Sequence, residues 1–214
     1  LDTVDPTVTI TSANVNDDGA FNAAVTLAFA TSESTSNFVA GDITAGGAGC
    51  SMGSLTTVSA SSYTIVCTPS GEGSVTINIA ASAFTDTAGN GNTVATQFDW
   101  THDVTAPSMT ISTGAVADGG YHNAAVTLTL TAGQATTNFA IGDVSATGTG
   151  DCTLSSWNAA SSTSYTVICT PDGEGTVVTQ VAAGTFTDAA GNSNTISNEY
   201  DWTHDVTDPV LSSA

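Results

Sequence analysis

The chain has 214 residues, of which 40% are hydrophobic and 7% aromatic, and it holds 20 Asp and Glu but no Lys or Arg. The formal net charge of −20 excludes nucleic acids, anionic membranes and acidic substrates as natural partners, because like charges repel. Without internal basic residues, each carboxylate has to face water, accept hydrogen bonds or bind a cation, and no apolar run is long enough to span a membrane.

Most of the sequence consists of two similar copies. The segment 84–90 leads into 99–107 in the first copy, and 186–192 leads into 201–209 in the second, with 102 residues between equivalent positions. A period of this length indicates two copies of one domain joined head to tail, and it is too long for a single coil of a solenoid.

The repeat defines the expected domain boundaries. We predict one domain at 1–102 and a second at 103–204. Residues 205–214 resemble 103–112, so they are expected to begin a third repeat or to form a strand exchanged with a neighbouring subunit. Because no signal peptide is visible and a third copy begins, we expect the chain to be a piece of a larger protein.

Short strands are predicted along each copy. In the first copy, apolar and polar residues alternate at 8–10, 25–29, 63–67 and 75–79, which is the period of a half-buried strand. Turn residues such as Gly, Pro and Asp separate these segments. About seven strands in roughly a hundred residues predict an all-β fold with two tandem immunoglobulin-like antiparallel β-sandwich domains.

Each copy carries two cysteines that lie 17 positions apart, with a predicted hairpin between them. Folding this hairpin about residues 58 and 59 places Cys50 directly opposite Cys67, within disulfide reach. We therefore predict the bridges Cys50–Cys67 and Cys152–Cys169, which are typical of an oxidising, extracellular setting. Free buried thiols and a zinc site are the alternatives, although no His lies near either pair in sequence.

Acidic and amide side chains gather where each copy ends. Hard cations such as Ca²⁺ take six to eight oxygen ligands, and this chain has no basic residue to neutralise the carboxylates. We predict that Ca²⁺ binds at these seams and fixes the angle between domains. The predicted ligands are Asp86, Asn90, Asp99 and Asp103 in the first set, and Asp188, Asn192, Asp201 and Asp205 in the second. In the alternative interpretation these are ordinary turn residues that bond their own backbone. A second candidate is Asp17–Asp18, with Asp118 in the second copy, at the opposite end of the domain by strand count.

Three motifs together resemble a known family. They are Asp-x-x-x-Pro-x-Val-x-Ile at 2–10, Phe-x-x-Gly-Asp-Ile at 38–43 and Phe-Thr-Asp-x-Ala-Gly-Asn at 84–90. The chain resembles the bacterial Ig-like repeats of large extracellular adhesins of the biofilm-associated type. This resemblance implies an extracellular stalk of tandem modules stiffened by Ca²⁺.

The resemblance also implies roles for particular acidic residues. The implied positions are Asp103 and Asp205 at the linkers, Asp86 and Asp188 in the turns, and Asp42 and Asp143. Glu33 matches an acidic position common in such repeats, and the chain departs from the family pattern at the equivalent Gln134 in the second copy, in its cysteine pairs and in its lack of Lys.

No catalytic set is visible. No nucleophile–His–carboxylate combination recurs in both copies, and the single Glu in each Gly-Glu-Gly turn has no acid partner. We predict a structural, non-enzymatic segment of an adhesin, stalk or filament, whose partners are further copies of the repeat in the same chain or in neighbouring subunits. The alternative is a glycan- or ice-binding module, with a cell-surface or glycan receptor, displayed on the loop around Trp157. Trp100 and Trp202 are expected to close the end of each core.

Overall fold

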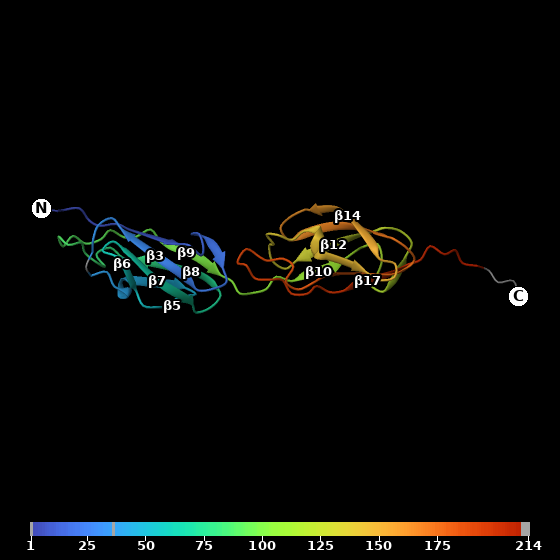
Figure 1. The fold of residues 1–214 in the computed structure, drawn as a ribbon, viewed down its shortest axis with the longest axis horizontal. Helices are drawn as coiled ribbons and strands as arrows, with labels where there is room; N and C mark the ends of the chain where they lie inside the picture. The colour runs from blue at the N-terminus through green and yellow to red at the C-terminus, as the bar shows by residue number, and fades with distance from the viewer. Residues whose placement is uncertain (1, 36, 211–214) are drawn as a thin grey trace. The chain divides into compact units, whose positions relative to one another are not determined.

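Two compact units make up the chain, Leu1–Val104 and Thr105–Ala214 (Figure 1). The computed structural model describes residues 2–35 and 37–210. Apart from one short 3₁₀ turn in each unit, the regular elements are all strands, which confirms the predicted all-β class. Of the expected third-repeat segment 205–214, residues 205–210 carry no strand, and residues 211–214 lie outside the described residues.

The first domain contains two sheets. One follows the order β1-β3-β7-β5, with β6 also paired to β7, and the other follows β2-β9-β8-β4. The elements are β1 (Val8–Ser12), β2 (Gly19–Phe21), β3 (Val25–Thr31), the 3₁₀ turn η1 (Ala40–Asp42), β4 (Ile43–Gly47), β5 (Cys50–Met52), β6 (Thr56–Ser59), β7 (Ser62–Pro69), β8 (Gly73–Ile79) and β9 (Phe98–His102).

The second domain repeats this topology. Its sheets follow the orders β10-β12-β15-β14 and β11-β17-β16-β13. The elements are β10 (Met109–Ser112), β11 (Gly120–His122), β12 (Val126–Ala132), the 3₁₀ turn η2 (Ile141–Asp143), β13 (Val144–Thr147), β14 (Cys152–Ala159), β15 (Ser164–Pro171), β16 (Gly175–Val181) and β17 (Tyr200–His204). The continuous β14 stands where the first domain has the separate strands β5 and β6.

One short pair in each domain is parallel. β2 runs parallel to β9, and β11 runs parallel to β17, whereas the other paired strands are antiparallel. Alternation of apolar and polar residues does not distinguish the two directions. In both copies the parallel strand follows the edge strand of the opposite sheet, so the chain crosses between sheets before it pairs.

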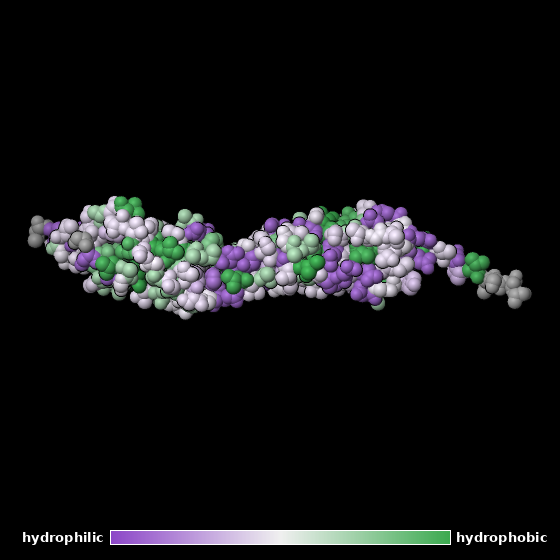
Figure 2. All heavy atoms as spheres, turned by 60° about the horizontal axis from the view of Figure 1, so that its bottom comes forward, coloured by the Kyte–Doolittle hydropathy of each residue, from purple (hydrophilic) through white to green (hydrophobic). Residues whose placement is uncertain are grey.

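Alternating side chains from both sheets form the core of each domain. In β3, Val25, Leu27 and Phe29 are fully buried, and each contributes about 1.5–3 kcal/mol of hydrophobic stabilisation. Trp100 and Trp202 are 1% and 0% exposed, as expected for residues that close the core. On the face drawn in Figure 2, the apolar residues left at the surface form separate small patches.

Both predicted disulfides are present, and their register differs from the prediction. Cys50 lies opposite Pro69, and Cys67 lies opposite Met52, so the bridge runs diagonally between β5 and β7 with a Cα–Cα distance of 5.5 Å. The hairpin turns after Ser59, which pairs with Ser62, instead of about residues 58 and 59. A bridge closing a loop of this length adds about 3 kcal/mol of stability in the chain-entropy model.

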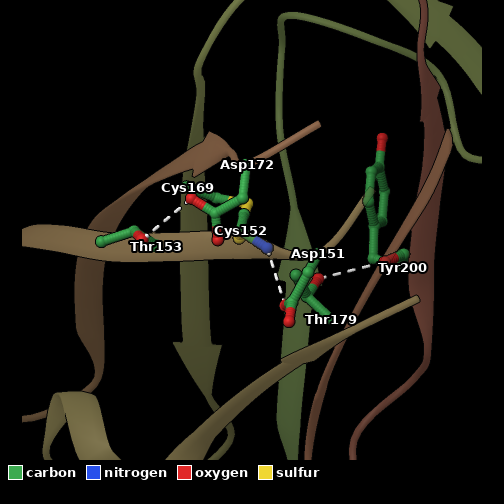
Figure 3. The surroundings of a disulfide bond; sticks show 7 residues. All are labelled: Asp151, Cys152, Thr153, Cys169, Asp172, Thr179 and Tyr200. Atoms are coloured by element: carbon green, nitrogen blue, oxygen red, sulfur yellow. Dashed lines mark hydrogen bonds between the residues drawn. A yellow bond between two sulfur atoms is a disulfide. The ribbon is translucent and has the colours of Figure 1, made fainter. Parts of the chain in front are cut away.

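The second bridge has the same diagonal geometry. Cys152 lies opposite Pro171, and the Cα atoms of Cys152 and Cys169 are also 5.5 Å apart (Figure 3). Beside it, the Thr153 hydroxyl donates a 3.1 Å hydrogen bond to Asp172, and the Cys152 N–H donates to the side chain of Asp151. Both bridges therefore fasten neighbouring strands within one sheet and do not join the two sheets.

Candidate cation site

The turn that follows β8 is organised by Asp86. Its Oδ1 accepts hydrogen bonds from the backbone N–H groups of Ala88, Gly89 and Asn90 at 2.8, 2.6 and 2.9 Å. Its Oδ2 accepts a 2.7 Å bond from the Asn90 side chain, and Asp86 is only 4% exposed. Asp86 and Asn90 thus hold the turn together, as the alternative interpretation of these residues expected.

The second copy builds the same turn. Asp188 accepts hydrogen bonds from the N–H groups of Ala190 and Asn192, both at 2.9 Å, and from the Asn192 side chain at 3.0 Å. Asp188 is also 4% exposed. The repeated Asp-x-x-x-Asn spacing is therefore explained by local hydrogen bonding in both domains, whether or not an ion is present.

Two further carboxylates meet Asp86 in the first domain. Oxygen atoms of Asp2, Glu33 and Asp86 all lie within 4.8 Å of one another. Asp2 precedes β1, Glu33 follows β3, and an isolated bridge between Thr35 and Asp86 holds the last two segments together. Asp2 is exposed, Glu33 half-buried and Asp86 buried, so the cluster extends from the surface inward.

The cluster changes the acidity of its members. Burial, followed by the neighbouring charges of Asp2 and Asp86, raises the pKa of Glu33 above its ordinary value of 4.5. For Asp86, burial is the largest influence and acts to raise the pKa, but the hydrogen bonds from Asn90, Gly89 and Ala88 together outweigh it and lower the pKa. A cation placed among the three carboxylates would offset this repulsion, and the 214 residues contain no Lys or Arg to supply one.

The second domain replaces the middle carboxylate with an amide. Gln134 stands at the position of Glu33 and, with its amide oriented to donate, lies 3.2 Å from Asp188 Oδ2 and 3.1 Å from the Thr105 carbonyl. Asp188 therefore receives a neutral hydrogen-bond donor where Asp86 faces a third carboxylate. The two turns share their backbone design and differ in local charge.

Asp99 makes its hydrogen bonds with a different acidic group from Asp86, and its part in cation binding stays a prediction. Asp99 lies in β9, where its N–H donates a 2.8 Å hydrogen bond to Asp17, and Asp201 makes the same 2.9 Å contact with Asp118. Strand β9 runs antiparallel to β8, so successive residues of β9 lie farther from the turn that follows β8. The second candidate group, Asp17–Asp18, therefore lies beside Asp99.

The linker residues Asp103 and Asp205 follow the last strand of each domain. The Asp103 N–H donates to the Phe21 carbonyl at 3.3 Å, and the Asp205 N–H donates to the His122 carbonyl at 3.2 Å. Their part in cation binding stays a prediction. Sequence reasoning had placed neither Asp2 nor Glu33 among the ligands, although Asp2 is the repeat equivalent of Asp103.

Three other residues singled out in the sequence have structural roles. Asp42 and Asp143 accept hydrogen bonds from the N–H groups of Val39 and Ala140, at 2.9 and 2.8 Å, and so cap the 3₁₀ turns. Trp157 lies in strand β14 and not in a loop, and it stacks on Tyr165 with a centroid separation of 5.4 Å. Because Trp157 is half-buried against the core, it does not offer the open aromatic platform that a loop would.

Comparison with known proteins identifies the type of domain. A family model described as a bacterial Ig-like domain matches residues 2–101 and 103–203. No curated protein sequence has significant similarity to the chain. Among the described residues, no helix has the length and apolar character needed to cross a membrane.

Solved structures of bacterial adhesins are among the matches to this chain. The adhesin InvE of Yersinia pseudotuberculosis is 11% identical with a TM-score of 0.33, covering 93% of this chain and 59% of that one. InvD of the same organism is 15% identical with a TM-score of 0.42, covering 99% and 62%. The D00–D0 domains of intimin are 18% identical with a TM-score of 0.41, covering 90% and 98%. The chain thus spans about three fifths of the two Yersinia structures.

Proposed function

Because the chain belongs to the bacterial Ig-like domain family, we propose that it is a structural, non-enzymatic segment of an extracellular adhesin, stalk or filament. Tandem sandwiches of this kind act as spacers, and their partners are further copies of the repeat in the same chain or in neighbouring subunits. Two disulfides support an oxidising, extracellular location. Nothing in the described residues indicates catalysis.

The finer part of the proposal is that Ca²⁺ stiffens the chain at the domain ends. One observation carries it, namely the convergence of Asp2, Glu33 and Asp86 within 4.8 Å in a chain without Lys or Arg. Carboxylate oxygens are the ligands that Ca²⁺ prefers, and backbone carbonyls and water complete its shell. Asp103, the repeat equivalent of Asp2, and Asp205 in the second copy are proposed as further ligands by their sequence positions.

The two repeats would differ in affinity. Three carboxylates are available in the first, whereas Gln134 replaces one of them in the second and already donates toward Asp188. The first site is therefore proposed as the tighter one, because affinity for Ca²⁺ rises with the charge of the ligands.

Thermal unfolding and small-angle scattering with Ca²⁺ and with chelator test this proposal. We expect Ca²⁺ to raise the unfolding temperature of the first domain and to narrow the distribution of interdomain distances. The Glu33→Gln variant serves as the matched control, since it copies the second domain. If neither the unfolding temperature nor the scattering responds to Ca²⁺, the carboxylates only hydrogen-bond within their own turns or face water.

The alternative function is a glycan- or ice-binding module. Its predicted platform, Trp157, is half-buried, so this proposal now depends on another exposed aromatic. Tyr121 is 75% exposed beside a shallow hollow lined by His122, Asn123 and Asp205. Loss of glycan binding in a Tyr121→Ala variant would favour this module over a spacer.

A further inference from the structure

The edge strand β1 presents unpaired backbone groups to one side. The Ser32 N–H donates a 3.0 Å hydrogen bond to the Thr7 carbonyl, and Ile10 lies opposite Phe29 in the ladder with β3. Bonding alternates along an antiparallel pair, so Thr7, Thr9 and Thr11 face β3. The N–H and C=O groups of Val8 and Ile10 therefore point away from the sheet.

In the second domain, a side-chain amide covers the equivalent edge. The Ile111 N–H donates to Asn198 Oδ1 at 2.8 Å, and Asn198 Nδ2 donates to the Ile111 carbonyl at 3.0 Å. The carboxamide thus makes the two hydrogen bonds that a neighbouring strand would make. Nearby, the Tyr200 hydroxyl donates to the Val116 carbonyl at 2.6 Å.

The first domain lacks both covering groups. Thr96 stands where the second domain has Asn198, and Phe98 stands where it has Tyr200. A cleft of about 320 Å³ lies here, between β1 and the segment 96–98, and Val15 and Asp17 also line it. No hydrogen bond from another part of the described chain reaches the outward groups of Ile10 or the Val15 carbonyl. We call this feature the β1 cleft.

Carboxylates surround one end of the β1 cleft. Asp17 lines it, and Asp18 and Asp99 are adjacent, with the Asp18 N–H donating to the Asp99 carbonyl at 2.9 Å. The charge of Asp99 is the largest cause, followed by its hydrogen bond and by Asp17, of a raised pKa at Asp18. The second domain has Gly119 at this position. The first domain therefore concentrates uncompensated negative charge beside an uncovered strand edge.

We propose that the β1 cleft binds an extended segment of another protein, which adds to β1 as a strand and directs a Lys or Arg toward Asp17, Asp18 and Asp99. A peptide group offers the same donor and acceptor pair as the Asn198 carboxamide, so the second domain already contains a mimic of the ligand. Alternate side chains of the segment would pack on Val8, Ile10, Val15 and Phe98.

The negative charge at the β1 cleft favours a basic segment of a different protein over a second copy of this chain. The 214 residues contain no Lys or Arg, so a second copy of them cannot neutralise the three carboxylates. Pairing of two such edges would instead bring like charges together. A basic extended segment of a different protein satisfies both the hydrogen-bonding groups and the charge.

Selection of displayed peptides tests the proposal. The 214-residue chain is offered a random library of eight-residue peptides in the presence of chelator, so that failure of the Ca²⁺ proposal does not affect the result. Selected peptides are then synthesised and titrated against the wild type and Thr96→Asn, which installs the amide of the second domain. Thr96 is exposed, so this variant is expected to fold normally, and its melting curve verifies this.

We expect selected peptides to contain Lys or Arg and to bind Thr96→Asn at least about tenfold more weakly, because two hydrogen bonds are lost. Asp18→Asn should weaken binding and reduce its dependence on salt, and Asn tolerates the positive φ of 62° at this position. Asn198→Thr, the matched variant in the second domain, uncovers the equivalent edge, but Gly119 stands there in place of Asp18, so this variant should add no site of comparable affinity for the selected basic peptides.

Other results of the same experiment would contradict the proposal. Peptides that bind the wild type and Thr96→Asn equally, or a library that yields no peptide distinguishing them, would overturn the β1 cleft as a strand-binding site. Self-association of the wild type that Thr96→Asn abolishes would show that the occupant is a second copy. Peptides without a basic residue that discriminate the two proteins would refute the charge requirement.

Discussion

The two domains share one backbone design and differ in how two of its surfaces are completed. In the second domain, Gln134 donates toward Asp188 and Asn198 bonds both outward groups of Ile111. In the first domain, Glu33 adds charge beside Asp86, and Thr96 leaves the edge of β1 uncovered. In the second domain, side-chain amides thus hydrogen-bond both the turn carboxylate and the strand edge. In the first domain, the turn keeps a further carboxylate and the strand edge keeps unpaired backbone groups.

The largest expected effect tests what the domains have in common. Asp86→Ala and Asp188→Ala each remove the acceptor of several hydrogen bonds in a buried turn, so each should lower the unfolding temperature of its own domain by roughly 10 °C or more. Calorimetry in chelator measures both. If only Asp86→Ala matters, and only with Ca²⁺, the turn role assigned to these residues is incorrect.

A reciprocal exchange tests the acidic cluster. Ca²⁺ at 100 times its Kd should stabilise the first domain by about 2.7 kcal/mol. Glu33→Gln should weaken this response to that of the second domain, and Gln134→Glu should strengthen the response of the second domain, because the exchange moves one carboxylate between equivalent sites. Titration of Ca²⁺ followed by thermal unfolding measures the effect. Equal responses in wild type and both variants would place the ion elsewhere.

A second exchange tests the strand edge. Asn198→Ala should destabilise the second domain by about 1–2 kcal/mol, since the outward groups of Ile111 lose their partner. Thr96→Asn should stabilise the first domain by up to about 1 kcal/mol. Denaturant unfolding of each domain measures both changes, and unchanged stability in both variants would mean that the amide contributes nothing beyond what water supplies.

The smallest effect is a dependence on pH. Because burial and its acidic neighbours raise the pKa of Glu33 above 4.5, the folded first domain binds this proton more tightly than the unfolded chain does. In chelator, its stability should therefore fall as the pH rises from about 4.5 through the raised value. Glu33→Gln should flatten this slope. A slope that persists in the variant would have to come from another group.

Local patterns in the sequence predicted the strands and both disulfides because each depends on spacing along the chain. The diagonal register of Cys50 and Cys67 escaped prediction, since the turn follows Ser59 and the two strands before it pair in shifted registers. The two Cα atoms are still close enough for a disulfide after this shift. The predicted pairing of the cysteines is therefore confirmed, whereas the prediction that they lie directly opposite each other is wrong.

The candidate sites depended on contacts that spacing does not reveal. Glu33 reaches Asp86 only because Thr35 bridges to the turn across about fifty residues. Asp99 is nearer to Asp86 in sequence but is carried away along β9 to Asp17. The sequence difference between Thr96 and Asn198 predicts an uncovered or a covered strand edge only when the position of the neighbouring edge strand is known. Comparing the two copies position by position flagged Gln134, and the same comparison would also have flagged Asn198.

The position of the disulfides has a consequence for a chain under tension. Each bridge encloses the 17-position span between its cysteines, whereas the first and last strands of each domain lie outside that span. When the ends of a domain are pulled apart, the force passes across the bridge and the enclosed loop stays slack. An oxidised domain therefore extends about 50–60 Å less than a reduced one. The bridge limits how far a module can lengthen before the next one begins to yield.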